Sequence, residues 1–441
     1  MNPLPKVVGL MQAKNEWPLL ALSISHALMY HVDEVYVLNH ASADGSFEGL
    51  QRLQELWKGR IHVMNFHDEH YWQEASTNVL IVVTQSASPD WIYVFDSDEF
   101  LLTPGNRPLK EILDDVDPKY AAVCYEVQNW ISTENFDETH LDHFRMLRYR
   151  SVPNLFLYMR EEIYADEILN GNLNFYDVPF PSKVIFRNDT ASWLAAGAHA
   201  LKSPTGVLTL DIGADELRVA HFPLLTGKRL ELKARQGRLV IQDRFPAYHG
   251  WQNQMIYRFS QDDKLDQFWE SHTITPHNDS NDRTLPSYVI DDGFVQAIEP
   301  VLCLLEEGLD SRILQKNGEP DLSTGRSDDT QIPFRTAVQL TRKFQLIADS
   351  LCLERDALVT ERNALVAERD AIVTQRDAIV TQRDAIVTQR DAIVTERDAL
   401  VTERDALVTE RDAILNSRTW RYTRFLRVIQ GYLARMGGKK V

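Results

Sequence analysis

The sequence contains little cysteine and no long apolar run. Its three cysteines, Cys124, Cys303 and Cys352, are far apart and form no C-x-x-C pair, so we expect free thiols rather than a zinc or dithiol redox site. No stretch approaches the roughly 18 to 20 apolar residues that cross a bilayer. A P-loop and a histidine-rich metal constellation are also missing. We therefore expect a cytoplasmic globular protein.

Basic residues are concentrated at the C-terminal end. The chain has a net charge of −17, yet residues 416–441 carry seven Lys or Arg and no acid. Residues 354–415 carry nine Arg against fourteen Asp or Glu, and the rest of the chain is strongly acidic. An acidic body with a basic tail argues against a nucleic-acid partner.

Glycine and proline are absent from residues 354–416, which repeat a unit of seven such as "ERDALVT" and "QRDAIVT" nine times. A period of seven predicts a helix that enters a left-handed coiled coil, over residues 346–416, and therefore a homo-oligomer. No register places apolar residues at both core positions, because Arg or Glu takes one whenever Leu or Ile takes the other. A solvated helical spacer is the alternative, and the strand number stays open.

The N-terminal part, residues 1–235, alternates apolar strands with amphipathic helices. We expect strands at "KVVGLM", "EVYVLN", "RIHVMNF" and "WIYVFD", each followed by a helix or a polar turn. This order predicts an α/β domain with a Rossmann-like, mostly parallel sheet. Ligands of such sheets bind at the carboxyl ends of the strands.

Acidic residues cluster at one of these strand ends. The strand in "WIYVFDSDEF" ends in Asp96, Asp98 and Glu99. Two carboxylates at i and i+2 just after a buried strand can share a divalent cation, which would offset their charge. The alternative is a solvated acidic turn. "KNE" (14–16) and "NHASADGS" (39–46) follow two other expected strands, so they should lie at the same edge of the sheet.

These motifs and their order resemble the N-terminal half of glycosyltransferases of the GT-A fold, in the family-2-like group, over about residues 5–235. The resemblance implies that Asn15, Glu16 and Asp44 hold the base and ribose of a nucleotide-diphosphate sugar. It further implies that Asp96 and Asp98 bind Mn²⁺ or Mg²⁺ at the donor diphosphate.

The later segments "PSKVIFRNDTASWLAAGAHALKS" and "LRVAHFPLLTGKRLELKARQG" also resemble this group. On that resemblance His221 is the third metal ligand, and Lys183 and His199 line the diphosphate or acceptor pocket. A histidine buried in the core, with no ligand role, is the alternative for His221.

The resemblance also implies an inverting mechanism, in which a carboxylate deprotonates the acceptor hydroxyl. The sequence does not single out this base. Six acids lie in the region expected near the acceptor: Glu126, Asp137, Glu161, Glu162, Asp166 and Glu167. Asp166, Glu167 and Glu126 are the candidates that we carry forward.

Two further segments complete the predicted organisation. We expect residues 236–345 to form a helical extension that packs on the catalytic domain, with a flexible linker at 317–333; the alternative role of this extension is to cover the acceptor site. Residues 417–441 form a basic amphipathic helix with an apolar stripe of Phe425, Val428, Ile429, Tyr432, Leu433 and Met436. This tail is suited to peripheral contact with an anionic membrane, and the alternative is a helix that caps the coil or docks on the acidic body. Its "S-x-x-W-R-x-T" start resembles the ending of bacterial surface-polysaccharide glycosyltransferases.

Three classes of function follow from these patterns. The first is a glycosyltransferase that uses a nucleotide-diphosphate sugar and a glycan or lipid-linked acceptor in surface polysaccharide synthesis. The second is a metal-dependent phosphotransferase or hydrolase that uses the same acids. The third is a coiled-coil scaffold with an inactive nucleotide-binding domain. The intact "DSD" and "KNE" motifs favour the first.

Overall fold

The computed structural model describes residues 3–66, 73–154, 161–188, 193–202, 206–242, 250–275, 286–309 and 331–436. The chain divides into two compact units, Met1–Ile347 and Ala348–Val441. All the described strands belong to the first unit. Among the described residues, no helix is long and apolar enough to cross a membrane.

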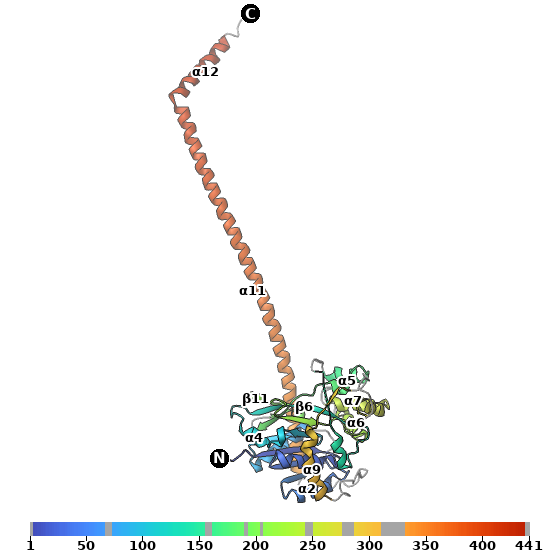
Figure 1. Cartoon of the computed structure of the whole chain (residues 1–441). Helices are drawn as coiled ribbons and strands as arrows, with labels where there is room; N and C mark the ends of the chain where they lie inside the picture. Colours follow the sequence, from blue (N-terminus) through green and yellow to red (C-terminus); the bar gives the residue numbers. More distant parts are fainter. Residues whose placement is uncertain are drawn as a thin grey trace. The chain divides into compact units, whose positions relative to one another are not determined.

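The first unit begins with strands and helices in alternation (Figure 1). In chain order these are β1 (Val7–Ala13), α1 (Leu19–Tyr30), β2 (Glu34–Asn39), α2 (Ser46–Leu56), β3 (Ile61–Asn65), α3 (Gln73–Val83) and β4 (Trp91–Val94). Strand β1 pairs in parallel with β2 and β4, and β2 pairs in parallel with β3. The Rossmann-like sheet predicted for residues 1–235 is therefore confirmed, and these four strands form its parallel part.

The sheet continues beyond β4 with strands of both directions. Helix α4 (Leu109–Asp114) follows the first of these strands. The strands are β5 (Glu99–Leu102), β6 (Ala122–Ile131), β7 (Tyr149–Ser151), β8 (Lys183–Arg187), β11 (Thr209–Asp211), β12 (Arg218–His221) and β13 (Tyr288–Ile290). The order is β13-β7-β6-β8-β4-β1-β2-β3, and β8 runs antiparallel to both β4 and β6. Strand β12 joins β5 to β6, which brings His221 opposite Glu99 and Asn129.

Side chains of β1 alternate between two cores because successive residues of a strand point to opposite faces. Val7 and Met11 belong to a core that includes α1 and α9 (Gly293–Gly308). Val8 and Leu10 belong to a second core that includes α3. The sheet is thus covered on both faces, which explains why its strands read as nearly continuous apolar runs.

Helices between residues 161 and 271 pack into a further cluster, which lies at one side of the first unit (Figure 1). These helices are α6 (Gly227–Gln242), α7 (Trp251–Gln261) and α8 (Leu265–Ser271), and α5 (Glu161–Leu169) packs with them. A two-stranded sheet pairs β9 (Trp193–Leu194) with β10 (Leu201–Lys202). Residue 235, the expected end of the catalytic domain, lies inside α6.

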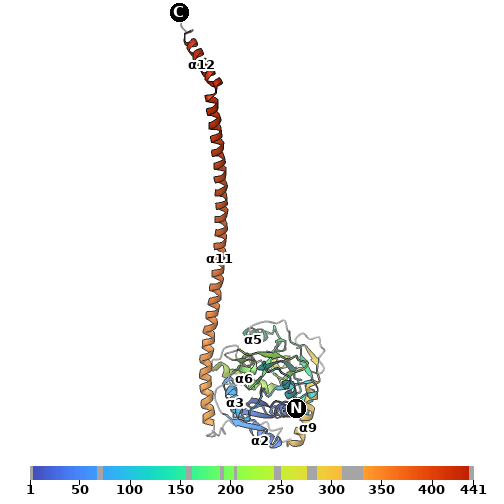
Figure 2. The same cartoon turned by 90° about the vertical axis from the view of Figure 1, so that its left-hand side faces the viewer.

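Helix α11 (Gln331–Asn416) carries all nine repeats, and α12 (Arg418–Met436) follows it (Figures 1 and 2). Ser417 separates them, and its hydroxyl accepts a hydrogen bond from the backbone N–H of Trp420, as a helix N-cap does. The helical prediction for the repeats and the tail is confirmed. Of the predicted linker, residues 317–330 lie outside the described residues, and residues 331–333 already belong to α11.

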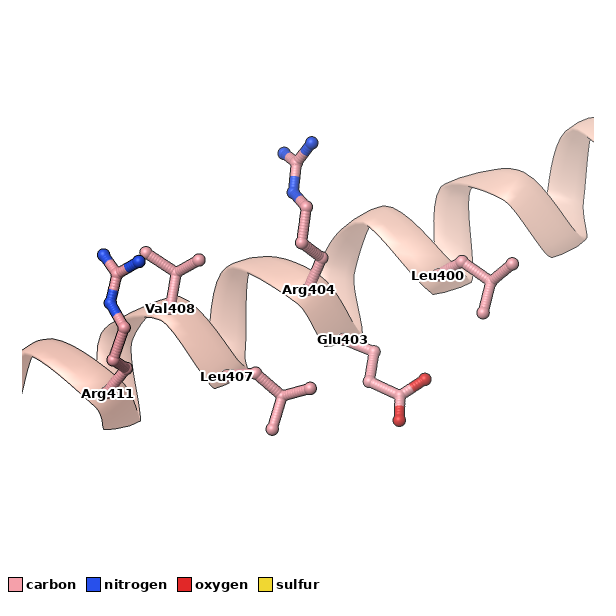
Figure 3. A pocket seen from close by; sticks show the side chains of 6 residues that line it. All are labelled: Leu400, Glu403, Arg404, Leu407, Val408 and Arg411. Atoms are coloured by element: carbon pink, nitrogen blue, oxygen red, sulfur yellow. The ribbon is translucent and has the colours of Figure 1, made fainter.

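The repeats of α11 expose one Leu or Ile in every seven residues, and each of these residues between Leu358 and Ile414 is 51 to 65% accessible. Figure 3 shows one stretch of the helix, in which Leu400, Glu403 and Leu407 point to one side. Apolar and charged side chains therefore alternate along this side. Such a face differs from a coiled-coil seam that is apolar at both core positions.

Candidate active site

A cavity of about 530 Å³ opens at the carboxyl ends of β1, β2 and β4. Five acidic side chains line it: Glu16, Glu74, Asp96, Asp98 and Glu99. Five basic side chains also line it: Lys14, Lys183, Lys202, Lys233 and Arg342. This is the edge of the sheet at which the sequence predicts a ligand site. Because the two signs of charge are balanced, the cavity can take an anionic ligand together with a cation.

The turn between β4 and β5 places Asp96, Ser97 and Asp98 at the carboxyl end of β4, where they line the cavity. Glu99, the first residue of β5, donates its backbone N–H to the carbonyl of Asp96 at 3.2 Å. In return the Glu99 Oε2 atom accepts the backbone N–H of Asp96 at 3.2 Å. The two bonds fold the chain tightly, so both aspartates of the predicted pair line the same cavity.

Lys183 neutralises one side of this turn. It starts β8, and its Nζ lies 3.0 Å from Asp96 Oδ2 and 2.5 Å from Glu99 Oε1. Burial alone would lower the pKa of Lys183, but Asp96 and Glu99 raise it above its ordinary value. Burial, opposed by Lys183, raises the pKa of Glu99, and the neighbouring aspartates add to the rise. Lys183 therefore stays charged and holds the acids together.

Asp98 meets a different pair of side chains. Lys233, on α6, places its Nζ 3.1 Å from Asp98 Oδ2, and the Nε2 atom of His221 lies 3.9 Å from the same oxygen. Burial alone would raise the pKa of Asp98, but the charge of Lys233 holds it well below its ordinary value. Burial lowers the pKa of His221 to about 4. At neutral pH Asp98 is thus ionised and His221 is neutral.

The orientation of His221 follows from its other ring nitrogen. Nδ1 lies 2.8 Å from the side-chain oxygen of Asn129, which can only accept a hydrogen bond. In the tautomer with the proton on Nδ1, that nitrogen donates to Asn129 and the lone pair of Nε2 faces Asp98. Imidazole nitrogens that ligate metals are commonly oriented in this way.

Glu16 ties the first strand to the same turn. Its carboxylate accepts a hydrogen bond from the Ser97 hydroxyl at 2.7 Å and contacts Arg229 of α6. Arg229 also bonds Glu138 at 2.5 Å, so Glu16, Arg229 and Glu138 form one chain of charges, of which Arg229 and Glu138 are buried. Burial raises the pKa of Glu16, and Arg229 opposes that rise. Glu16 lines the cavity, but its carboxylate is already bonded within the protein.

Asn15 and Asp44 organise the loops beside the cavity and are not among its lining residues. The side-chain oxygen of Asn15 accepts the backbone N–H of Ala43 at 2.8 Å. Asp44 accepts the backbone N–H groups of Trp17 and Ser46, each at 3.0 Å. Both side chains therefore connect the loop after β1 to the loop after β2.

His199 lies at another wall of the cavity. Its Nδ1 lies 2.9 Å from the carbonyl of Ser182, just before Lys183. Burial lowers the pKa of His199 to about 4. Gly197 allows this placement, because its φ is 68° and a Cβ there would come within 2.6 Å of His199 Nε2. The structure thus brings Glu16, Asp96, Asp98, Lys183, His199 and His221 to one cavity.

The three candidate bases lie elsewhere and do not line this cavity. Asp166 pairs with Arg258 at 2.9 Å on the surface. Glu167 accepts a hydrogen bond from Asn172, and Glu126 accepts one from Gln128. All three carboxylates are bonded to neighbours on the outside of the unit.

Several lining residues were not predicted. Lys233 comes from α6, and Arg229, four residues earlier on the same face, contacts the lining residue Glu16 without lining the cavity itself. Trp251 comes from α7, and Arg342 and Gln345 come from the start of α11. The sequence signal for Arg229 and Lys233 was the basic run "GKRLELK", but the face that enters the site depends on how α6 packs.

The metal expectation can be tested on the chemistry of these donors. Within the described residues, no group of three His, Cys, Asp or Glu side chains is arranged to enclose a metal ion. Asp98 and the Nε2 lone pair of His221 do fit an open site, because Mg²⁺ is often bound by one or two carboxylates together with substrate phosphates. In the structure Lys233 pairs with Asp98, and Lys183 pairs with Asp96 and Glu99.

The family model of glycosyltransferase family 92 matches residues 8–191. That stretch contains β1 to β8 and the Asp96–Asp98 turn, whereas His221 and Lys233 lie beyond it. The match supports a glycosyltransferase-like fold for this part of the chain. The family-2-like group stays a prediction.

A search of curated proteins finds no match. Among solved structures the chain is similar to S. aureus TarS 1–349 in complex with UDP, at 11% identity over 70% of this chain and 89% of that chain, with a TM-score of 0.29. The complex of the same protein with UDP-GlcNAc gives the same coverage and identity with a TM-score of 0.28. A CMP:2-keto-3-deoxy-manno-octonic acid synthetase with CTP gives 16% identity, 42% and 75% coverage and a TM-score of 0.21.

Proposed function

We propose that the chain is a glycosyltransferase that moves a sugar from a nucleotide-diphosphate donor to a glycan or lipid-linked acceptor. The observation that carries the proposal is the meeting of Asp98, His221 and Lys233 in the cavity at the strand ends. The match to glycosyltransferase family 92 over residues 8–191 supports the same activity.

The basic side chains account for donor binding. Lys14, Lys183, Lys202 and Lys233 line the cavity and offer positive charge to a diphosphate. Lys183 is already bound by two carboxylates, so Lys233 is the cation best placed to turn from Asp98 to a phosphate oxygen. Trp251 adds an apolar wall at the side of α7, where a sugar ring can pack.

The reaction breaks the bond between the anomeric carbon and the diphosphate oxygen and forms a bond from that carbon to the acceptor oxygen. Negative charge grows on the departing diphosphate, and a cation fixed beside it lowers the barrier. Lys233 supplies such a charge from the protein. In the inverting course that we infer, the acceptor proton passes to a carboxylate on the opposite face of the sugar.

We propose that Asp98 and His221 hold Mn²⁺ or Mg²⁺ when the donor is bound, with Asp96 as a further donor. A bound divalent cation would act as a Lewis acid on the diphosphate. Asn129 contributes by fixing the tautomer of His221 at 2.8 Å. Ser97, held by Glu16, fixes the turn between the two aspartates.

A thermal-shift panel tests the proposal on the full-length chain. UDP, GDP, CMP and dTDP sugars are added with and without Mn²⁺, and the unfolding temperature is measured. We expect one conjugate to stabilise the protein, and to stabilise it more when Mn²⁺ is present, because ligands of the folded state raise its apparent stability. If no conjugate shifts the unfolding temperature, the proposed function is wrong.

We also propose that the repeats join several copies of the chain. The supporting observation is the exposed Leu or Ile in every seventh position of α11, which a second copy could cover while Glu and Arg pair across the contact. Removal of this helix provides the test, which is described in the Discussion.

We further propose that α12 contacts an anionic membrane surface, which would suit a lipid-linked acceptor. Phe425, Val428 and Tyr432 are exposed on this helix, and four arginines recur every third residue from Arg418 to Arg427. Each such cation adds about 1 kcal/mol near an anionic surface. The full-length protein should sediment with anionic liposomes at low salt, and removal of residues 418–441 should abolish this. Equal sedimentation of both forms, or of neither, contradicts it.

A further inference from the structure

The first turns of α11 belong to the same compact unit as the cavity. Phe334 is buried, and its ring meets that of Phe66, just after β3, with the centroids 5.2 Å apart. Val338, one turn further, is fully buried in the core that includes α3. This start of α11 is therefore packed into the unit that holds the candidate active site.

One face of this segment changes from apolar to polar along its length. Four residues at i, i+4, i+8 and i+11 share the face: Phe334, Val338, Arg342 and Gln345. The first two are packed in the core, and the last two line the cavity. On other faces Leu340 and Phe344 are exposed, although they are apolar. On this face Arg342 and Gln345 thus line the cavity, whereas the exposed apolar residues lie on other faces.

Gln345 is the unusual member of this face. Only 5% of it is exposed, and neither Nε2 nor Oε1 of its carboxamide has a hydrogen-bond partner within the described residues. A carboxamide can donate two hydrogen bonds and accept two. Buried polar groups without partners are unfavourable and rare in native proteins. A ligand in the cavity would supply the missing partners.

We propose that Gln345 is a specificity-determining residue of the donor site, and that its carboxamide bonds a ligand group with a hydrogen-bond donor and an acceptor side by side. This inference rests on the proposed function, since it takes the cavity to be the nucleotide-sugar site. The amide-like edge of a nucleobase has this chemistry, and so do neighbouring hydroxyls of a hexose.

The test compares two variants of the full-length chain, Gln345→Met and Gln339→Met. Methionine keeps the length of the side chain and removes both polar atoms. Gln339 is the matched control, because it is an exposed glutamine on the same segment of α11. The unfolding temperature is measured without ligand. Calorimetric Kd values are then measured with Mn²⁺ for the nucleoside diphosphate selected by the panel and for its sugar conjugate.

For Gln345→Met we expect an unfolding temperature at or above that of the wild type, since the unpaired buried groups are gone. We expect its Kd for the sugar conjugate to rise about tenfold, the effect of losing one or two hydrogen bonds. Gln339→Met should change neither quantity. An equal rise for the nucleoside diphosphate alone assigns Gln345 to the base, and a rise confined to the conjugate assigns it to the sugar.

Two results would overturn the inference. Unchanged Kd values for both ligands would show that Gln345 takes no part in binding. A clear fall in the unfolding temperature of ligand-free Gln345→Met would show that its carboxamide supports the fold instead. If the wild type itself binds no nucleotide, the proposed function fails and this inference fails with it, and that result does not involve the variant.

Discussion

In the cavity of the first unit Lys183 meets Glu99 with side chains that are 5% and 3% exposed, whereas in the repeats Arg369 meets Asp370 with side chains that are 68% and 61% exposed. The two ion pairs have nearly equal lengths, 2.5 and 2.7 Å. Their surroundings differ, since one is shielded from water and the other is solvated. Distance alone therefore says little about what a charge pair does.

The difference has a physical consequence for each unit. In a buried pair the loss of one partner leaves an uncompensated charge, so each side chain depends on the other. A solvated pair contributes little, because water replaces either partner. The cavity is thus a connected set of charges that a ligand can rearrange. In the repeats the ion pairs contribute little, so the feature that suggests a function is the exposed stripe of Leu and Ile.

Replacement of Lys183 by Met should give the largest change in stability. Asp96 and Glu99 would both lose their buried cation, and such losses typically cost about 3–5 kcal/mol of unfolding free energy. Arg369→Met, its counterpart in the repeats, should change the unfolding free energy by less than about 0.5 kcal/mol. Urea unfolding followed by tryptophan fluorescence reports mainly on the first unit, which holds eight of the nine tryptophans. Equal losses for both variants would contradict this distinction.

The next largest effect concerns pH. His31 is buried, lies 2.8 Å from the carbonyl of Leu101, and burial lowers its pKa to about 4. Because the unfolded histidine takes up a proton below about pH 6.5 and the folded one does not, its contribution to stability is present above pH 6.5. That contribution is lost as pH falls from about 6.5 to about 4.

Between pH 7 and pH 5 the wild type should therefore lose about 2 kcal/mol more unfolding free energy than His31→Gln. The comparison isolates His31, since groups such as Glu99 titrate in both proteins. Residues 348–441 contain no histidine, so no histidine of the second unit makes a similar pH-dependent contribution to the unfolding free energy. Parallel stability curves for the two proteins would remove His31 as the cause.

The smallest expected effect is on ligand binding by the first unit alone. A chain that ends after Ile347 keeps Phe334, Val338 and Gln345, so its nucleotide Kd should stay within about twofold of the full-length value. Its mass by light scattering should fall to that of a monomer, since the repeat stripe has been removed. An unchanged number of copies per particle would refute association through α11. A large rise in Kd would show that residues after Ile347 act on the cavity.

The sequence alone predicted the features of both units that depend on local patterns. Alternating apolar segments predicted β1 to β4, and the position of Asp96 and Asp98 after a buried strand predicted their place in the cavity. The seven-residue period predicted the helix of the repeats. Each of these features is decided by neighbours within a few residues.

Features that depend on packing between distant segments were not predictable. Lys233 and Arg229 reach the turn only because α6 packs against the strand ends. Asn15 and Asp44 stay predicted ligand-binding residues, and the hydrogen bonds of their side chains to the two loops depend on how those loops pack. Gln345 lies eleven residues beyond the buried Phe334, inside a helix whose later part is exposed. The contacts of Asp44, Asn15, Lys233 and Arg229 named here join residues that are 27 to 213 positions apart in sequence.

One pair of variants tests most directly whether the cavity charges are functional and the repeat charges are not. Asp98→Asn and Asp370→Asn each remove one carboxylate charge, and sugar-transfer rates are measured with Mn²⁺ and the donor that the panel selects. We predict that Asp98→Asn lowers turnover by about 10²–10³-fold, the cost of losing one fixed charge that acts on the leaving group, with its fold retained by circular dichroism. Asp370→Asn should match the wild type. Wild-type turnover in Asp98→Asn would contradict the account.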